Sequence, residues 1–225
     1  RESLVQRLAS RGINVKPSNI LITSGSLQAL QLISVGRLKT GAQVYTETPT
    51  YLKSLQVFQS AGISFTGIAM DKSGLVPWKI GKVPNGSLLY TIPTYQNPTT
   101  LVMTAARRKE VFDFCSKYRL PILEDDAYGE LHFDENTPPL PIKALDDSGV
   151  VLYTGTISKT LAPGFRVGWL VGPESVVNRL ADVKMQMDYG ASSLSQWALT
   201  EIFNSGAYDE YLGQLRLQLK ERRDI

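Results

Sequence analysis

The sequence predicts an α/β protein, a three-layer α/β/α sandwich built on a mainly parallel sheet. Short apolar runs alternate with longer amphipathic segments along the whole chain, as strands and crossover helices do in such folds. Two of these runs, residues 88–92 and 122–123, are apolar enough to be strands buried on both faces. The 225 residues suit one such domain, and no linker-like stretch divides residues 1–225.

The composition is that of a soluble globular protein, with 43% hydrophobic and 20% charged residues. The net charge of +3 is low and no block of lysine and arginine occurs, so nucleic-acid binding by this segment is not indicated. No apolar run reaches transmembrane length and no signal peptide is visible. A single cysteine, Cys115, excludes an internal disulfide framework and fits a reducing cytoplasm.

The expected elements follow from apolar periodicity and from the Gly and Pro residues between them. We expect strands at 19–23, 43–47, 64–70, 88–92, 122–123, 150–153 and 167–171. We expect helices at 2–11, 27–33, from Tyr51 to Gly62, from Thr104, at 173–187, from Ser192 and at 207–223. A polar connection is expected at 71–86, and Arg107, Arg108 and Lys109 are expected to form a solvated helix face.

The stretch from Tyr153 to Trp169 contains the strongest chemical signal. One apolar run ends in small hydroxylated residues, and Arg166 opens the next run, so Lys159 lies in the connection between two strands. Burial between these strands and a nearby guanidinium would both favour the neutral, nucleophilic amine of the lysine. Arg166 and the hydroxyls of Thr156 and Ser158 suit a phosphate dianion.

Two further segments place polar groups at the ends of expected elements. At residues 24–27, Gly25, Ser26 and Leu27 lead into a helix, whose free N–H groups could bind an anion or whose serine could simply be an N-cap. Asp125 lies within three consecutive carboxylates at the carboxyl end of a buried strand, with Tyr128 three residues later. Ligands bind at such strand ends. Clustered acids can also bind metal, but no histidine or second acidic cluster accompanies these.

The stretch Thr156-Ile157-Ser158-Lys159, followed by Pro163-Gly164-Phe165-Arg166-Val167-Gly168, resembles the lysine motif of pyridoxal 5'-phosphate (PLP) enzymes of aminotransferase fold type I. The resemblance covers essentially all 225 residues, and its other motifs follow in the family's order. It implies the large PLP-binding domain of that fold. It also implies that Lys159 forms the Schiff base with the cofactor and later moves a proton.

The resemblance assigns the remaining site residues one by one. Residues 24–27 resemble the first phosphate loop of the family, in which Leu27 replaces the usual glutamine, so only its backbone could contact the phosphate. The resemblance implies that Ser26, Thr156, Ser158 and Arg166 bind the phosphate.

Three more motifs concern the ring of the cofactor. Tyr51 follows the Glu-x-Pro-x-Tyr pattern and would stack on the ring, although a buried packing tyrosine is also possible. Asn97, in a Gln-Asn-Pro-Thr motif where Thr100 replaces the usual glycine, and Tyr128 would hydrogen-bond the phenolate oxygen. Asp125 would keep the ring nitrogen protonated.

The resemblance is greatest to the aminotransferase-like domain of the MocR subfamily of GntR regulators, particularly at residues 188–198. Two functions therefore stay open: an aminotransferase acting on an amino acid and a 2-oxo acid, or a ligand-sensing domain that controls transcription. The family implies a homodimer. We expect the chain to be a segment of a longer protein, in which any DNA contact comes from a domain outside these residues.

Overall fold

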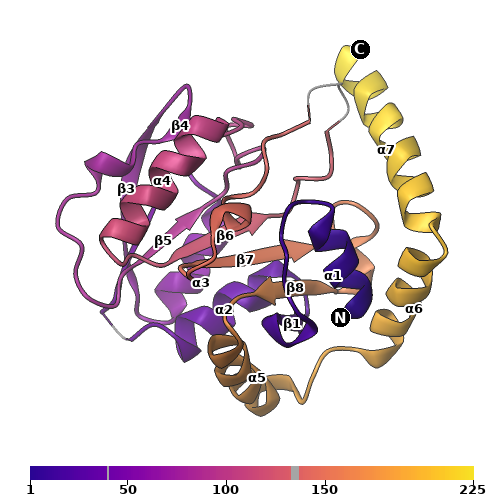
Figure 1. Ribbon diagram of the computed structural model, residues 1–225, viewed down its shortest axis with the longest axis horizontal. Coiled ribbons are helices and arrows are strands. Elements are labelled where there is room, and N and C mark those ends of the chain that lie inside the picture. The colour runs from indigo at the N-terminus through magenta and orange to yellow at the C-terminus, as the bar shows by residue number, and fades with distance from the viewer. Residues whose placement is uncertain (40, 133–136) are drawn as a thin grey trace.

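The computed structural model describes residues 1–39, 41–132 and 137–225, which form one central sheet with helices packed on both faces (Figure 1). Within these residues the strands are β1 (Ile20–Thr23), β2 (Gln43–Thr48), β3 (Ser64–Asp71), β4 (Gly74–Leu75), β5 (Leu88–Thr91), β6 (Ile122–Asp126), β7 (Val151–Thr156) and β8 (Gly168–Val171). The α-helices are α1 (Glu2–Ala9), α2 (Ser26–Gly36), α3 (Leu52–Ser60), α4 (Ala105–Lys117), α5 (Glu174–Asp188), α6 (Ser193–Asn204) and α7 (Ala207–Asp224).

The sheet has the strand order β1-β8-β7-β6-β5-β2-β3-β4. Neighbouring strands from β3 to β7 run parallel, whereas β8 is antiparallel to both β7 and β1, and β4 is antiparallel to β3. The predicted fold class, with its mainly parallel sheet, is therefore confirmed. Because β8 runs antiparallel to both of its neighbours, β1 and β7 run in the same direction. The carboxyl ends of these two strands therefore lie at the same edge of the sheet.

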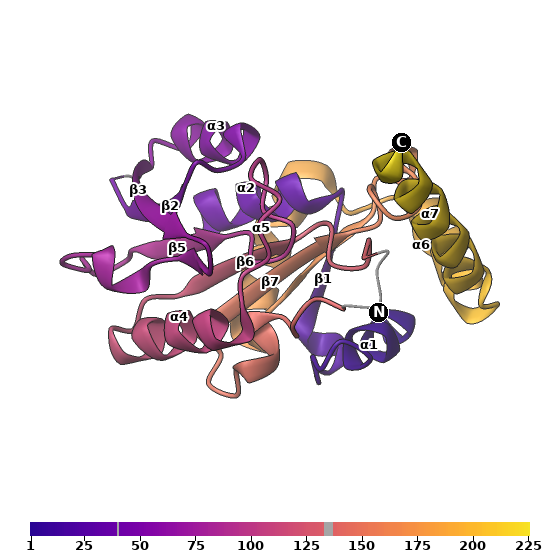
Figure 2. The same cartoon turned by 90° about the horizontal axis from the view of Figure 1, so that it is seen from above.

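The helices form two layers, one on each face of the sheet. Helices α2, α3 and α5 cover one face, whereas α1 and α4 cover the other, and α6 and α7 stand at the side next to α1 (Figure 2). The first layer packs on a buried cluster that includes Leu30, Tyr90, Leu123 and Leu152. On the opposite face there are two further buried clusters. One packs α4 against the strands, and the other packs α1, α6 and α7 against them. The sheet is thus buried on both sides, as the apolar strands predict.

Two local expectations were wrong. The connection 71–86 contains the short strand β4. Arg107 and Arg108 are buried, not solvated, with only Lys109 of the basic triplet exposed. The reason is that the Arg108 guanidinium donates hydrogen bonds to three backbone carbonyls, those of Pro93 and Met103 in the connection before α4 and that of Leu140 in the connection after β6. A buried guanidinium is tolerated where its donors are satisfied in this way. In the described part of the chain, no helix is long and apolar enough to cross a membrane.

Candidate functional site

The candidate site lies at the edge of the sheet where the carboxyl ends of β1, β2, β5, β6 and β7 meet. All of these strands run in the same direction, so the loops that follow them gather on one side of the sheet. Each of the sequence motifs with chemical content lies in one of these loops or at the end of the strand that precedes it. The topology therefore brings together segments separated by more than a hundred residues.

All of the residues that the sequence assigns to the site line one cavity of about 170 Å³. They are Gly25, Ser26, Leu27, Tyr51, Asn97, Asp125, Tyr128, Thr156, Ser158, Lys159 and Arg166. Ile92, Ala127 and Pro163 also line it and were not predicted. Each of these three lies next to a predicted segment or within one, so their omission reflects apolar side chains that carry no chemical signal.

The start of α2 forms one wall of the cavity. The N-cap is Gly25, and no side chain caps the helix, so the alternative of a serine N-cap at Ser26 is not realised. Gly25 has φ +93°, and a Cβ at this position would lie 2.9 Å from Arg166 Nη2. The backbone conformation therefore favours glycine strongly, and a side chain here would displace the Arg166 guanidinium from its present position. The first residues of the helix line the cavity and their backbone N–H groups have no side-chain cap, as an anion site requires.

The loop after β7 holds the hydroxyl and guanidinium groups. The Thr156 hydroxyl donates to the Val167 carbonyl at 3.1 Å and accepts from the Ser158 backbone N–H at 3.1 Å, so it fixes the loop between β7 and β8. Arg166 has left-handed backbone geometry and donates from Nη2 to the Ser24 carbonyl at 2.6 Å. This bond ties the lysine loop to the loop at the start of α2.

Lys159 lies in the same loop, beyond the end of β7. Its side chain is exposed, so the expectation that burial between two strands removes it from water was wrong. The physical reason is that β7 ends at Thr156 and β8 begins only at Gly168, so the lysine lies in the loop between them and lines the open cavity. Its Nζ lies 5.9 Å from the centre of the Tyr128 ring.

The three consecutive carboxylates of β6 have different surroundings because successive side chains of a strand point to opposite faces. Glu124 accepts backbone N–H bonds from Ile142 and Lys143 at 2.9 and 2.8 Å. Asp126 pairs with Arg11 at 2.8 Å on the same face. Only Asp125 lines the cavity. The acidic run therefore does not converge on one point, as a metal site would require.

Asp125 is buried, and its two carboxylate oxygens differ. Oδ2 accepts a hydrogen bond from the Tyr90 hydroxyl at 2.8 Å, whereas Oδ1 has no partner among the described residues. Burial raises the pKa of Asp125 to about 6, the Tyr90 hydrogen bond opposes this rise, and the charge of Asp126 adds to it. A buried carboxylate with a free oxygen and no paired cation is suited to a positively charged donor from a ligand.

Aromatic and amide groups form the opposite side of the cavity. Tyr51 is the N-cap of α3 and is partly buried; it packs against the first core cluster and also lines the cavity, so the packing role and the predicted site position are compatible. Burial raises the pKa of Tyr128, and a hydrogen bond with Asn97 opposes this rise. Asn97 and Tyr128 therefore lie within reach of each other, although they come from loops that follow different strands.

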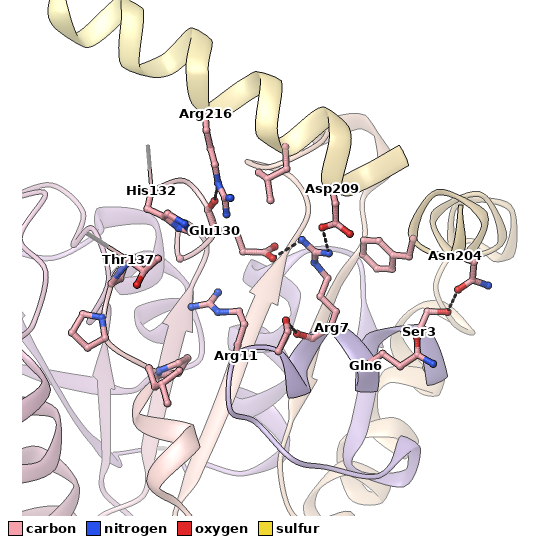
Figure 3. Close-up of a pocket in the computed structure, with 18 residues that line it drawn as sticks. Ser3, Gln6, Arg7, Arg11, Glu130, His132, Thr137, Asn204, Asp209 and Arg216 are labelled. Atoms are coloured by element: carbon pink, nitrogen blue, oxygen red, sulfur yellow. Dashed lines mark hydrogen bonds and ion pairs between the residues drawn. The ribbon is translucent and has the colours of Figure 1, made fainter. Parts of the chain in front are cut away.

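A larger cavity of about 620 Å³ lies between α1, α7 and the segments around Glu130 and Pro139 (Figure 3). It contains none of the predicted site residues. Its charged groups are largely paired, since Arg7 binds Glu130 at 2.6 Å and Asp209 at 2.9 Å. This pairing makes the larger cavity a polar junction between helices and not a second candidate for the predicted chemistry.

Comparison with known proteins identifies the family. The family model of aminotransferase class I and II matches residues 1–225. The chain belongs to the class I and II aminotransferases. It is 36% identical to the Pyrococcus horikoshii kynurenine aminotransferase, whose structure was solved in complex with PMP. The structural alignment covers 100% of this chain and 57% of that chain, with a TM-score of 0.90. The cofactor of the family is PLP, and the implied fold and cofactor are confirmed.

Several curated relatives of this aminotransferase domain are named as transcriptional regulators. The chain is 53% identical to the uncharacterized HTH-type transcriptional regulator YisV of Bacillus subtilis (strain 168), covering 100% of this chain and 47% of that protein. It is 36% identical to the HTH-type transcriptional regulator NorG of Staphylococcus aureus (strain USA300), again over 100% of this chain and 51% of that protein. The chain thus spans about half the length of the curated relatives it matches, and the predicted resemblance to regulators is confirmed.

The residues present fit PLP. The unpartnered Oδ1 of Asp125 is the acceptor that a protonated ring nitrogen needs. At the other end of the cavity, the start of α2, Ser158 and Arg166 supply donors for a phosphate. A side chain at position 25 would collide with the arginine of this cradle. An acceptor for a cation and donors for an anion thus line one cavity.

Sequence reasoning missed one polar residue that contacts the site. Tyr90 was predicted only as part of a buried strand, yet its hydroxyl is the hydrogen-bond partner of Asp125. A signal was present, because a tyrosine in the middle of a fully apolar strand must find a partner for its hydroxyl. Sequence alone could not say which group that partner is.

Proposed function

We propose that the chain is a PLP-dependent aminotransferase domain that transfers an amino group between an amino acid and a 2-oxo acid. The observation that carries this proposal is the convergence of the predicted residues on one cavity at the carboxyl ends of the strands. When bound, PLP supplies an electron sink for the bond that breaks at the α-carbon of the substrate. The protein's contribution is to bind, orient and move protons.

Lys159 is proposed as the residue that binds the cofactor covalently and then moves a proton at the substrate. It is the lysine that lines the cavity, and its exposed amine reaches into the open part of it. A flexible four-carbon side chain lets the same amine act in both steps. Asp125, which is buried and lines the same cavity, is proposed to hold the ring nitrogen in its protonated form through Oδ1.

The other residues are proposed to orient the cofactor. Ser26, Ser158 and Arg166 bind the phosphate together with the backbone N–H groups of Ser26 and Leu27. The hydroxyl of Thr156 donates to the backbone and accepts from Ser158, so its contribution is to position that serine.

Three residues are proposed to contact the ring. Tyr51 stacks on its face, whereas Asn97 and Tyr128 donate to the phenolate oxygen. Asn97 lies close enough to the Tyr128 hydroxyl to oppose the rise in its pKa, and both residues line the cavity, which supports this pairing. Fixed donors of this kind lose little entropy when the cofactor binds.

The test is multiple turnover. The protein loaded with PLP is mixed with an amino acid and a 2-oxo acid, and the new amino acid is quantified over many equivalents of protein. Lys159→Ala serves as the inactive reference, and Lys109→Ala, on the exposed face of α4, serves as the matched control. Turnover that survives in Lys159→Ala would contradict the assignment of the lysine.

A second function is favoured by the curated relatives: a ligand-sensing domain of a transcriptional regulator. The regulators YisV and NorG match the chain over its whole length, with about half of each protein outside the match. We propose that the complete protein carries a winged-helix DNA-binding domain before Arg1. A coding sequence that lacks a helix-turn-helix pattern there would contradict this. Single turnover without multiple turnover would favour the sensor, whereas multiple turnover would favour the enzyme.

The whole protein is also proposed to be a homodimer. Large apolar side chains are exposed together at the end of α5 and the start of α6, namely Met185, Met187, Tyr189, Leu194 and Trp197. Such a concentration of exposed apolar surface marks an interaction site more often than a solvated face. A symmetric partner would cover the same surface on both copies.

A further inference from the structure

We propose that Tyr90 is a positioning residue, whose buried hydroxyl clamps one oxygen of Asp125 so that the other oxygen faces the cofactor cavity. The inference rests on the proposed role of Asp125 and adds a residue that no motif of the sequence contains. Its basis is a single geometry: a fully buried tyrosine, a 2.8 Å hydrogen bond to Oδ2, and an unpartnered Oδ1 on the same carboxylate.

The sheet register explains why Tyr90 reaches this carboxylate. Tyr90 in β5 lies opposite Leu123 in β6, and Asp125 is two residues farther along β6. Residues related in this diagonal way point to the same face of the sheet and are within reach of a long side chain. The ring of Tyr90 is itself held edge-on against Phe58 of α3, with the ring centres 5.7 Å apart. The hydroxyl therefore has little freedom to leave the carboxylate.

The clamp also connects two proposed contacts of the same cofactor ring. The Ser54 hydroxyl hydrogen-bonds the Tyr51 carbonyl at 2.6 Å and also contacts the Tyr90 hydroxyl. A continuous chain of contacts therefore runs from the backbone of Tyr51, through Ser54 and Tyr90, to Asp125. The residue proposed to stack on the ring and the residue proposed to hold its nitrogen are thus placed relative to each other by buried groups, which is how a site is preorganised.

Hydrogen bonding to a carboxylate favours its ionised form. The other ionisable groups near Asp125 are Asp126 on the same strand, Glu47 on β2, and the cavity-lining Tyr128, Lys159 and Arg166. Of the neighbours that affect the pKa of Asp125, Asp126 raises it and the Tyr90 hydroxyl opposes the rise. Removal of the Tyr90 hydroxyl should therefore leave Asp125 protonated to a higher pH, where it cannot hold a protonated ring nitrogen.

The experiment compares Tyr90→Phe with Tyr153→Phe. Tyr153 is an ideal control, because it is a buried tyrosine on the same sheet that donates to the neighbouring carboxylate Asp126 at 2.9 Å, but on the opposite face. Each variant loses one buried hydroxyl–carboxylate bond and keeps its ring. A structural effect should therefore be common to both, whereas a positioning effect should occur only in Tyr90→Phe.

Two measurements are made on each variant. In the protein without PLP, the titration of the Asp125 side-chain carboxyl is followed by carbon-13 NMR, with Asp125→Asn used to assign the signal. Tyr90→Phe should shift the midpoint up by about one pH unit or more, and Tyr153→Phe should leave it unchanged. The affinity for added PLP is then measured against pH. It should fall by up to about tenfold in Tyr90→Phe below pH 6, and less at pH 8.

Equal midpoints and equal PLP affinities for the two variants would overturn the inference. If Tyr90→Phe does not fold, the same readouts are made on Ser54→Ala, which leaves Tyr90 in place and should give a smaller shift in the same direction. If the wild-type protein does not bind PLP, the proposed function fails. The NMR titration would still decide, on its own, whether Tyr90 controls the ionisation of Asp125.

Discussion

The substitution Asp125→Asn should make the protein without PLP more stable while weakening its binding of PLP. Burial raises the pKa of Asp125 from its ordinary value of 3.8 to about 6. The folded protein therefore opposes ionisation of this carboxyl more strongly than the unfolded chain does. Asparagine has nearly the same shape and can still accept from Tyr90, but it carries no charge.

The sign and size of the stability change follow from the linkage between proton binding and folding. A raised pKa means that the contribution of Asp125 to stability is fully present below about pH 4 and is lost as the pH rises through about 6. Asparagine does not titrate, so the two proteins should be equally stable at pH 4. At pH 8 the variant should be more stable by up to about 3 kcal/mol, the equivalent of roughly two pKa units.

The affinity for PLP should change in the opposite direction. Hydrogen bonds to charged groups contribute about 1.5–3 kcal/mol and neutral ones about 0.5–1.5 kcal/mol, so PLP should bind roughly tenfold more weakly to Asp125→Asn. Chemical denaturation at pH 4, 6 and 8 measures the first effect, and titration with PLP at pH 8 measures the second.

Asp126→Asn is the matched control on the same strand. Asp126 pairs with Arg11 at 2.8 Å and accepts from Tyr153 at 2.9 Å. Breaking a buried ion pair should cost about 3–5 kcal/mol of stability, with little change in the PLP affinity of the folded protein. The reasoning is refuted if Asp125→Asn is the less stable of the two at pH 8, or if both weaken PLP binding equally.

Three other predictions concern Lys159, the contact of Tyr208 in α7 with Thr160 and Glu130, and the oligomeric state. Lys159→Ala should abolish the PLP adduct that borohydride fixes, detected by mass spectrometry; an adduct of wild-type stoichiometry would place the cofactor on another lysine. Tyr208→Phe should lower the unfolding free energy by about 1–3 kcal/mol, because the Tyr208 hydroxyl lies 2.6 Å from Thr160 Oγ1 and 2.9 Å from Glu130 Oε2; a change below 0.5 kcal/mol by denaturation (roughly the experimental error) would contradict it. The full-length protein with PLP should sediment as a dimer at micromolar concentration, and a monomer there would argue against the proposed interface.

Much of the site could be predicted from sequence because each motif follows an apolar run. An apolar run followed by polar residues marks the end of a buried strand, and parallel strands place their carboxyl ends at one edge. The alternation of side chains along a strand also separates Asp125 from Glu124 and Asp126 without any knowledge of their partners. These rules depend only on local sequence or on strand topology, so they can be applied before the structure is known.

Other features depend on contacts between distant segments, and sequence could not give them. Arg108 looks like a surface residue in its helix, but it is buried because two separate loops present three carbonyl groups to it. Lys159 was expected between two strands, yet β7 ends three residues before it and the side chain is exposed. The partner of Tyr90 is likewise fixed by strand register and not by spacing along the chain.

Two aspartates of β6 each accept a hydrogen bond from a tyrosine of a neighbouring strand, one on each face of the sheet. Asp125 accepts from Tyr90 at 2.8 Å, and Asp126 accepts from Tyr153 at 2.9 Å. The two pairs differ in the third group: Arg11 neutralises Asp126, whereas no arginine or lysine pairs with Asp125 among the described residues. A buried carboxylate without a cation costs stability unless a ligand supplies the charge. The absent cation, and not the carboxylate or its tyrosine, is therefore what marks Asp125 as the member of the pair available to a cofactor.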